Sequence, residues 1–176
     1  NEPTVANLFQ KNGYNTAMIG KWHLGIEWQY LTDFESTKEK RRNSGWAIDF
    51  TKPALRTPVT NGFDYFWGIA ASLDMSPYLY IENKMAQSTE QIIKKGGRSG
   101  PMDINFKANE CLKNFAKKSV TYIDEQAKSD KPFFLYIPLT SPHSPVVPSE
   151  AWLGKSPDGR YGDFLMETDW VVGPVL

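Results

Sequence analysis

The chain has 176 residues, 40% of them hydrophobic and 14% aromatic, so it is long enough and apolar enough to fold around a substantial core. Its 20 basic residues balance its 20 acidic residues, and a formal net charge of zero gives no electrostatic reason to expect binding to nucleic acid or to an anionic membrane. The single cysteine excludes an intrachain disulfide and a multi-cysteine zinc site, and no apolar run approaches the roughly 20 residues that cross a bilayer.

The first predicted elements are a helix and a strand. Pro3 suits a first helical turn, and Gly13 stands where a helix would end, so we expect a short amphipathic helix over about 3–12. The apolar residues at helical spacing are Val5, Leu8 and Phe9. The run YNTAMIG then predicts a strand that ends at Lys21, which together with the helix forms a unit typical of an α/β protein.

Residues 27–61 are more polar and contain two prolines, so we expect a solvated loop or a small excursion from the domain. The basic residues of this segment are Lys38, Lys40, Arg41, Arg42, Lys52 and Arg56. The alternative interpretation is that this basic cluster contacts an anionic substrate.

The middle of the chain predicts a strand, a hairpin and a helix. Residues 62–84 are dense in aromatic side chains, and Tyr78, Tyr80 and Ile81 suggest a second strand. Residues 87–101 indicate a surface hairpin or loop, and helical spacing then runs from about residue 105 to residue 126. Cys111 lies on the apolar side of that helix, so we expect a core residue and not a nucleophile.

The clearest strand follows this helix. Five consecutive apolar residues, 133–137, are typical of a parallel strand that is buried on both faces. The strand leads into a proline-rich loop that carries His143, and the sequence after Asp163 predicts the start of another helix.

His23 and His143 are the only histidines, and each follows an apolar strand in a turn built from glycine or proline. Ligands of open α/β sheets bind beyond the carboxyl ends of the strands, where loops carry functional residues on a rigid scaffold. Each histidine alone is equally consistent with a hydrogen-bonded structural role. Their common placement favours a functional one.

The motif GKWHLG adds a lysine to the first histidine. Residues i and i+2 of an extended segment point to the same side, so we expect Lys21 and His23 to share a pocket while Trp22 packs on the opposite side. An ammonium group beside an imidazole is unfavourable when both are protonated, unless both face an anion. A neutral imidazole would instead serve as a proton carrier. A zinc site built on two histidines with no acidic cluster nearby is not expected.

Four stretches of the chain carry a family resemblance: GYNTAMIGKWHLG, NGFDYFWGIAASLDMSPY, PFFLYIPLTSPHSP and METDWVVGPVL. In this order they resemble the type I sulfatases, the arylsulfatase group of the alkaline-phosphatase-like superfamily, over essentially the whole chain. The resemblance implies a three-layer α/β/α sandwich around a large mixed sheet, here incomplete at both ends. It also implies hydrolysis of sulfate esters by a formylglycine nucleophile, usually with a calcium ion.

The resemblance also assigns roles to individual residues. Lys21 matches a lysine that contacts the nucleophile and a sulfate oxygen. His23 matches a histidine that hydrogen-bonds the formylglycine hydrate and helps to break down the sulfated intermediate. His143 matches a histidine that contacts the ester oxygen and protonates the leaving group. Ser72 matches, more loosely, a serine that contacts substrate, and its alternative role is a turn or cap residue. Asp74 either pairs with Lys21, binds substrate, or is a structural acid of a turn.

Parts of the family pattern are absent from this sequence. Cys111 is followed by Leu-Lys-Asn-Phe and not by the x-Pro-Ser-Arg that completes the formylglycine motif. The aspartate pair that binds the metal is also absent, as is the later Asp-Asn pair with its substrate lysine. We therefore expect residues 1–176 to be the central part of a sulfatase catalytic domain, with the calcium ligands of the full-length parent outside this chain. These residues alone are expected not to hydrolyse a sulfate ester.

The resemblance implies a sulfate ester of a small molecule or a glycan as substrate, and a periplasmic, secreted or lysosomal location. Two alternatives remain at this point. One is a phosphodiesterase or phosphonate hydrolase of the same superfamily, and the other is a non-catalytic relative that binds sulfated glycans. The aromatic residues that would line a sugar subsite, although most are expected in the core, are Tyr65, Phe66, Trp67 and Tyr78.

Overall fold

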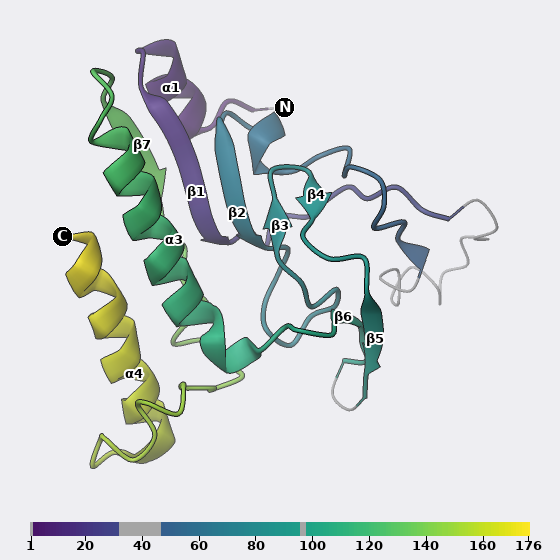
Figure 1. Ribbon diagram of the computed structural model, residues 1–176, viewed down its shortest axis with the longest axis vertical. Helices are drawn as coiled ribbons and strands as arrows, with labels where there is room; N and C mark the ends of the chain where they lie inside the picture. Colours follow the sequence, from purple (N-terminus) through teal and green to yellow (C-terminus); the bar gives the residue numbers. More distant parts are fainter. Residues whose placement is uncertain (1, 32–46, 96–97) are drawn as a thin grey trace.

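The computed structural model describes residues 2–31, 47–95 and 98–176 and shows a mixed β-sheet flanked by helices (Figure 1). The principal elements are α1 (Val5–Lys11), β1 (Asn15–Lys21), β2 (Tyr65–Ile69), β3 (Ile81–Glu82), β4 (Met85–Ala86), β5 (Gln91–Lys94), β6 (Gly100–Asp103), α3 (Cys111–Gln126), β7 (Phe133–Tyr136) and α4 (Gly159–Val172). Short 3-10 turns lie at Pro58–Thr60, Ala108–Glu110 and Gly173–Val175. No helix in these described ranges is long and apolar enough to cross a membrane.

The main sheet has the strand order β4-β3-β2-β1-β7. β1 pairs in parallel with both β2 and β7, whereas β3 and β4 are antiparallel. The arrows of β1, β2 and β7 therefore point the same way in Figure 1, and the segments that follow them leave from one edge of the sheet. The α/β prediction is confirmed, and the parallel pairing is what gathers three loops at that edge.

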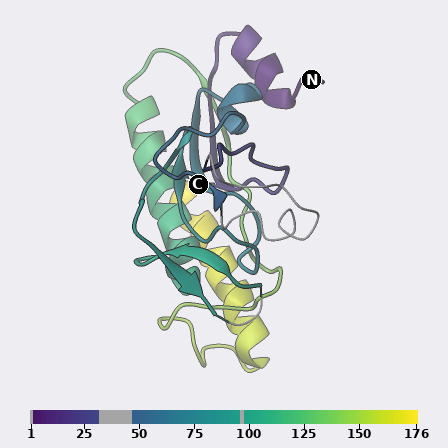
Figure 2. The ribbon, with the colours of Figure 1, turned by 90° about the vertical axis from the view of Figure 1, so that its right-hand side faces the viewer.

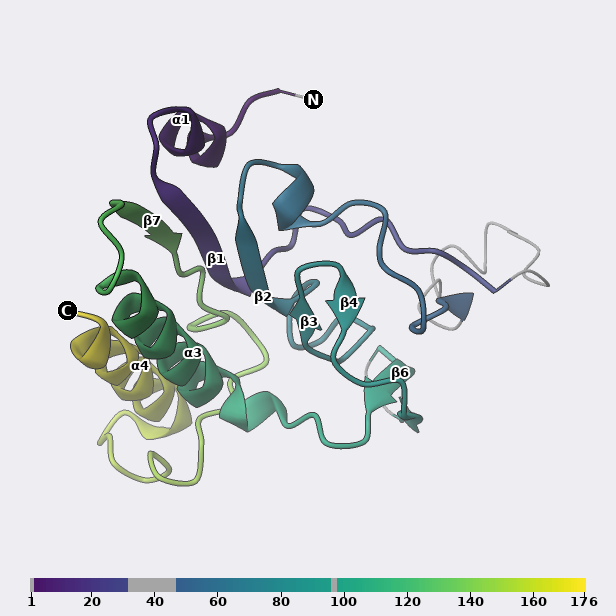
Figure 3. The ribbon, with the colours of Figure 1, turned by 45° about the horizontal axis from the view of Figure 1, so that its top comes forward.

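Alternate residues of the central strands enter two core clusters on opposite faces of the sheet. Met18 and Phe66 belong to one cluster, while Ile19 and Trp67 belong to the other, as the two-residue period of a strand requires. α3 covers the second face, and α1 lies on the first (Figure 2). α4 packs beside α3 through a third cluster (Figure 3). β1 is buried along its length because both of its faces are covered.

The helix expected at about 3–12 is confirmed as α1, but its first residue and its buried face differ from the prediction. α1 begins at Val5 and not at Pro3, because Thr4 caps it: the Thr4 hydroxyl accepts a hydrogen bond from the Asn7 N–H at 3.3 Å. Thr4 also donates to the carbonyl of Asn61 at 2.7 Å. The helix so anchored turns Ala6 into the core and leaves Val5 and Leu8 exposed.

The strand predictions for the last two-thirds of the chain are partly wrong. The strand expected at 78–81 is reduced to β3, and the aromatic run before it contains β2, which we did not predict. β7 is the edge strand of the sheet within the described chain, and it is not buried along its length as expected. Phe134 and Leu135 pack against the two core clusters, but Phe133 and Tyr136, at the two ends of the strand, are exposed. The hairpin expected near 87–101 is confirmed as β5 and β6.

The segment expected to be solvated contributes to the core where the structure describes it. Trp28, Ile48 and Phe50 are buried in the first core cluster, and Trp28 meets Phe50 edge-on with ring centroids 5.7 Å apart. Of the basic residues in this segment, four lie outside the described residues: Lys38, Lys40, Arg41 and Arg42. The other two form ion pairs, Lys52 with Asp49 and Arg56 with Glu27.

Cys111 is fully buried at the start of α3, as predicted for a core residue. Burial raises the pKa of its thiol to about 12, so the thiolate needed for nucleophilic attack is not formed at neutral pH.

Candidate active site

Backbone hydrogen bonds join the three segments that leave the carboxyl ends of β1, β2 and β7. The Lys21 N–H donates to the carbonyl of Pro138, beyond β7, at 2.8 Å. The N–H groups of Trp22 and His23 donate to the carbonyls of Ile69 and Ala70, at the end of β2, at 3.0 Å each. The GKWHLG motif is thus held between the two neighbouring segments.

Two glycines permit this close approach. Gly20 has a φ of +145°, and a Cβ atom placed on it would clash with the carbonyl oxygen of Pro138. Gly20 lies opposite Gly68 in the register of β1 and β2, and a Cβ on Gly68 would clash with the carbonyl oxygen of Gly20. Only glycine avoids both clashes, so the position of Lys21 depends on these two residues.

The backbone leaves the extended conformation at His23, whose φ is +57°, in the left-handed region. We expected the side chains of Lys21 and His23 to point to the same side because the chain would be extended, but the backbone is not extended at His23. Their common orientation therefore stays a prediction. His23 is exposed and Lys21 is half-buried. Trp22 packs against the first core cluster, as predicted, and its indole N–H donates to the carbonyl of Gly25 at 2.8 Å.

The structure brings Ser72 and His143 together from loops that follow β2 and β7. The Ser72 hydroxyl oxygen lies 3.2 Å from Nδ1 of His143, and Ser72 is buried while His143 is exposed. Nδ1 also lies 2.5 Å from the carbonyl oxygen of Ser144. Because a carbonyl only accepts, this contact places a proton on Nδ1, and the Ser72 hydroxyl oxygen is then a second acceptor of the same proton. Nε2 is left as the ring nitrogen that can exchange a proton with a ligand.

Asp74 does not pair with Lys21. Its Oδ2 lies 3.7 Å from Nε of Arg98, in the turn between β5 and β6, and its buried Oδ1 has no hydrogen-bond partner. Lys94 lies close by, with its ammonium nitrogen 3.8 Å from the ring centroid of Tyr78, and burial lowers the pKa of Lys94. Sequence reasoning predicted a surface hairpin or loop here and did not connect it with Asp74, because nothing local shows that the hairpin folds back beside that residue.

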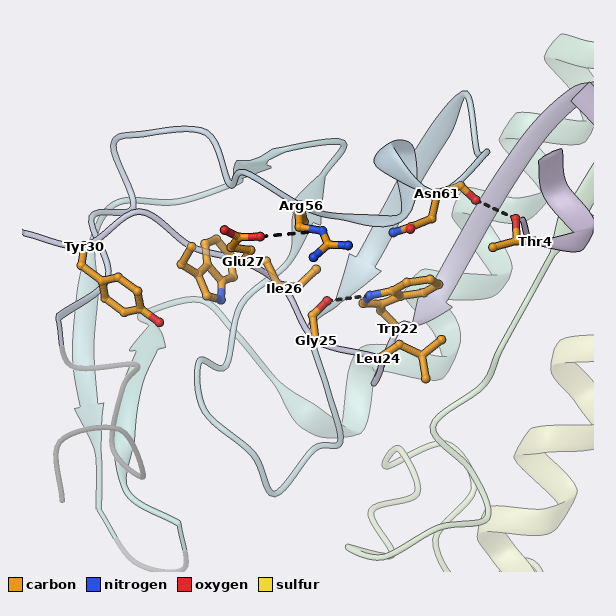
Figure 4. A pocket seen from close by; sticks show the side chains of 10 residues that line it. Thr4, Trp22, Leu24, Gly25, Ile26, Glu27, Tyr30, Arg56 and Asn61 are labelled. Atoms are coloured by element: carbon orange, nitrogen blue, oxygen red, sulfur yellow. Dashed lines mark hydrogen bonds and ion pairs between the residues drawn. The ribbon is translucent and has the colours of Figure 1, made fainter. Parts of the chain in front are cut away.

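A cavity of about 500 Å³ lies next to the GKWHLG motif (Figure 4). Trp22, Leu24 and Gly25 line one end, and Tyr30 lies at the other end. The pair formed by Arg56 and Glu27, with Nε and Oε2 3.7 Å apart, lies between them. Lys21 and His23 do not line this cavity, so the predicted site residues gather on the loops of the sheet edge and not within it.

The resemblance implies a calcium ion, which prefers several carboxylate and carbonyl oxygens as ligands. Among the side chains the structure describes, no three His, Cys, Asp or Glu residues lie together in a group that could hold a metal ion. The residues at 2–31, 47–95 and 98–176 therefore do not fit a complete calcium site.

Comparisons with known proteins match nearly the whole chain to sulfatases. A family model described as Sulfatase matches residues 1–176. N-acetylgalactosamine-6-O-sulfatase of Bacteroides thetaiotaomicron is 25% identical over 198 residues, which cover 98% of this chain and 38% of that protein. Human N-acetylgalactosamine-6-sulfatase is 28% identical over 181 residues, which cover 99% of this chain and 28% of that protein.

Solved structures show the same fold. A sulfatase structure from work on glycosaminoglycan metabolism by Bacteroides thetaiotaomicron aligns with a TM-score of 0.77 at 22% identity, covering 98% of this chain and 41% of the other. A sulfatase from Pseudoalteromonas aligns with a TM-score of 0.63 at 22% identity, covering 98% of this chain and 33% of the other. The chain thus spans well under half the length of each of these proteins.

Proposed function

This chain belongs to the sulfatase family, whose model matches it over residues 1–176, and on that premise we propose that the protein is a sulfuric ester hydrolase. We place residues 1–176 in the central part of its catalytic domain. The observation that supports the proposal most strongly is the meeting of three loops at one edge of the sheet, where Lys21, His23, Ser72 and His143 reside.

Lys21 is proposed to bind the sulfate group. Its ammonium group has no ion-pair partner within the described ranges, so it is available for an external anion. Cleavage of the S–O bond moves negative charge toward the bridging oxygen and keeps the non-bridging oxygens anionic. A fixed cation beside those oxygens stabilises the transition state in a site prepared before the reaction.

His143 is proposed to protonate the leaving oxygen. Its Nδ1 proton is held by the Ser144 carbonyl, so Nε2 is the nitrogen that would carry the transferred proton. General acid catalysis of this kind contributes roughly 10²–10⁴-fold to the rate. Ser72 lies against the same imidazole, and we propose that it orients this ring as well as contacting substrate.

His23 is proposed to act on the nucleophile. A formylglycine, supplied by a Cys-x-Pro-Ser-Arg motif that this chain does not contain, would provide the attacking oxygen. His23 is then placed to hydrogen-bond that group and to accept a proton when the sulfated enzyme is broken down. Calcium, with ligands outside this chain, is proposed as the metal of the whole protein.

The proposed substrate is a sulfate ester of a carbohydrate. The support comes from relatives named for N-acetylgalactosamine 6-sulfate, and the proposed location is periplasmic, secreted or lysosomal. Asp74, two residues after Ser72, and its ion-pair partner Arg98 are proposed to contact the sugar, because a carboxylate and a guanidinium both hydrogen-bond hydroxyl groups.

The test uses the full-length protein and a panel of N-acetylgalactosamine 6-sulfate, galactose 6-sulfate and 4-nitrophenyl sulfate, with released sulfate as the readout. We expect His143→Ala and Lys21→Ala each to lower kcat/KM by about 10²-fold or more. Lys128→Ala, which removes an exposed lysine beyond α3, is the matched control and is expected to be neutral. Hydrolysis that is unchanged in both site variants would disprove the assignment, and hydrolysis of phosphate diesters in place of sulfate esters would favour the superfamily alternative.

A further inference from the structure

The segment 137–158, which connects β7 to α4, carries His143 and is called the His143 loop below. Figure 1 shows that it runs along the lower end of the molecule before α4 begins. The imidazole of His143 is exposed, and the polar groups that contact it are the Ser72 hydroxyl and the Ser144 carbonyl. The path of the loop backbone determines whether the ring reaches these two groups.

α4 binds the His143 loop through three of its side chains. The carboxylate of Asp163 accepts hydrogen bonds from the N–H groups of Gly154 and Ser156, at 2.8 and 2.7 Å. One oxygen of the buried Glu167 carboxylate accepts from the N–H of Ser149 at 2.8 Å. Asp163 and Glu167 are four residues apart and thus share one side of the helix.

The third contact lies nearest to the histidine. The hydroxyl oxygen of Thr168 lies 2.6 Å from that of Ser141 and 2.7 Å from the carbonyl oxygen of Phe164. The carbonyl can only accept, so the single proton of the Thr168 hydroxyl goes to it, and the Ser141 hydroxyl supplies the proton between the two side chains. Both residues are half-buried, and Ser141 stands two residues before His143.

We infer that Thr168 is a positioning residue for His143, which it holds in place through Ser141. This inference rests on the proposed function of His143. Ser72 and the Ser144 carbonyl orient the ring itself, whereas Thr168 fixes the backbone from which the ring projects. α4, which follows the His143 loop, thereby contributes to catalysis through the position of His143.

The test compares Thr168→Val, which keeps the shape of the side chain and removes the hydroxyl, with Thr168→Ser, which keeps the hydroxyl. The full-length protein is assayed with whichever ester of the panel above it hydrolyses fastest. We expect Thr168→Val to lower kcat by about 10-fold with KM unchanged within about twofold, because a misplaced acid affects the transition state more than substrate binding. Thr168→Ser is expected to restore most of the rate.

α3 provides a matched control. Thr121 also donates its hydroxyl proton to the carbonyl four residues earlier, that of Lys117, at 3.0 Å, but it is exposed, and its hydroxyl makes no hydrogen bond to the described residues of the His143 loop. Thr121→Val therefore removes the same intrahelical hydrogen bond and is expected to leave kcat unchanged. Ser141→Ala removes the contact from the other side and is expected to reproduce the effect of Thr168→Val.

A second readout does not depend on activity. The ¹⁵N chemical shifts of the His143 imidazole report its tautomer, and His143→Gln identifies the signals. We expect these shifts to change in Thr168→Val and Ser141→Ala and to stay constant in Thr121→Val. Shifts that change in a protein that hydrolyses no ester of the panel would uphold the positioning role and reject the proposed function. Unchanged shifts, or equal effects of Thr168→Val and Thr121→Val on kcat, would overturn the positioning role.

Discussion

Gly20 allows β1 to approach the chain that follows β7. Because its φ is +145° and a Cβ would clash with the carbonyl of Pro138, we expect Gly20→Ala to lower the free energy of unfolding by at least about 2 kcal/mol. Gly13→Ala is the control: Gly13 also has a positive φ, of +83°, but nothing lies near its missing side chain. That variant should lose only about 1–2 kcal/mol, the cost of the left-handed backbone.

Urea unfolding of the two variants measures this difference. If Gly20→Ala and Gly13→Ala are destabilised equally, the contact between Gly20 and Pro138 does not constrain the fold as described. A loss of sulfate ester hydrolysis in Gly20→Ala at temperatures where the protein remains folded would connect the backbone contact to the position of Lys21.

At the scale of elements, the carboxylate of Asp163 on α4 binds backbone N–H groups of the His143 loop. Hydrogen bonds from the backbone N–H groups of Ser156 and Gly154 lower the pKa of Asp163 below its ordinary value. A carboxyl group with a lowered pKa in the folded state contributes stability above its unfolded pKa, near 3.9, and this contribution is lost as the pH falls through the lower folded pKa.

We therefore expect the protein to lose stability as the pH is lowered below about 4, and expect Asp163→Asn to show a smaller loss over the same range. Urea midpoints between pH 2.5 and pH 6 measure both. Asp158→Asn, an exposed acid that precedes α4, is the matched control and should retain the wild-type dependence. An identical pH dependence for Asp163→Asn and the wild type would show that Asp163 does not bind the loop in its charged form.

The elements that local sequence patterns describe well were predicted, and those that depend on neighbours were not. β1, the β5–β6 hairpin and α3 follow from apolar spacing and turn residues near each element. β7 has the composition of a strand buried on both faces, but burial depends on what lies beside it, and within the described chain it is an edge strand. β2 was missed because its aromatic residues were interpreted as general core composition.

In the candidate site, too, local sequence patterns predicted some features and could not predict contacts between distant segments. The expectation that the residues after β1 and β7 meet at one edge follows from the parallel sheet, and the backbone bonds of Lys21 and His23 agree with it. The contact of Ser72 with His143 and that of Asp74 with Arg98 join residues far apart in the sequence. No local pattern encodes either pair, so only the folded chain shows them.

At the scale of the whole molecule, the chain provides the sheet edge and its loops but not the formylglycine motif. Purified residues 1–176 are therefore expected to release no sulfate from any ester of the panel, because the proposed acid, His143, and the proposed sulfate-binding residue, Lys21, have no nucleophile to assist. The full-length protein at the same concentration is the positive control. Sulfate release by the 176-residue chain that His143→Ala abolishes would show that the chain contains its own nucleophile.

The central claim is that the loops after β1, β2 and β7 form the binding site for the sulfate group. The most direct measurement is a crystal structure of the full-length protein with N-acetylgalactosamine 6-sulfate bound to a His143→Ala or His23→Ala variant that turns it over slowly. We predict that the sulfate lies within hydrogen-bond distance of the Lys21 ammonium, next to Ser72 and the remaining histidine. A sulfate bound instead in the cavity between Trp22 and Tyr30, or elsewhere away from this sheet edge, would contradict the account.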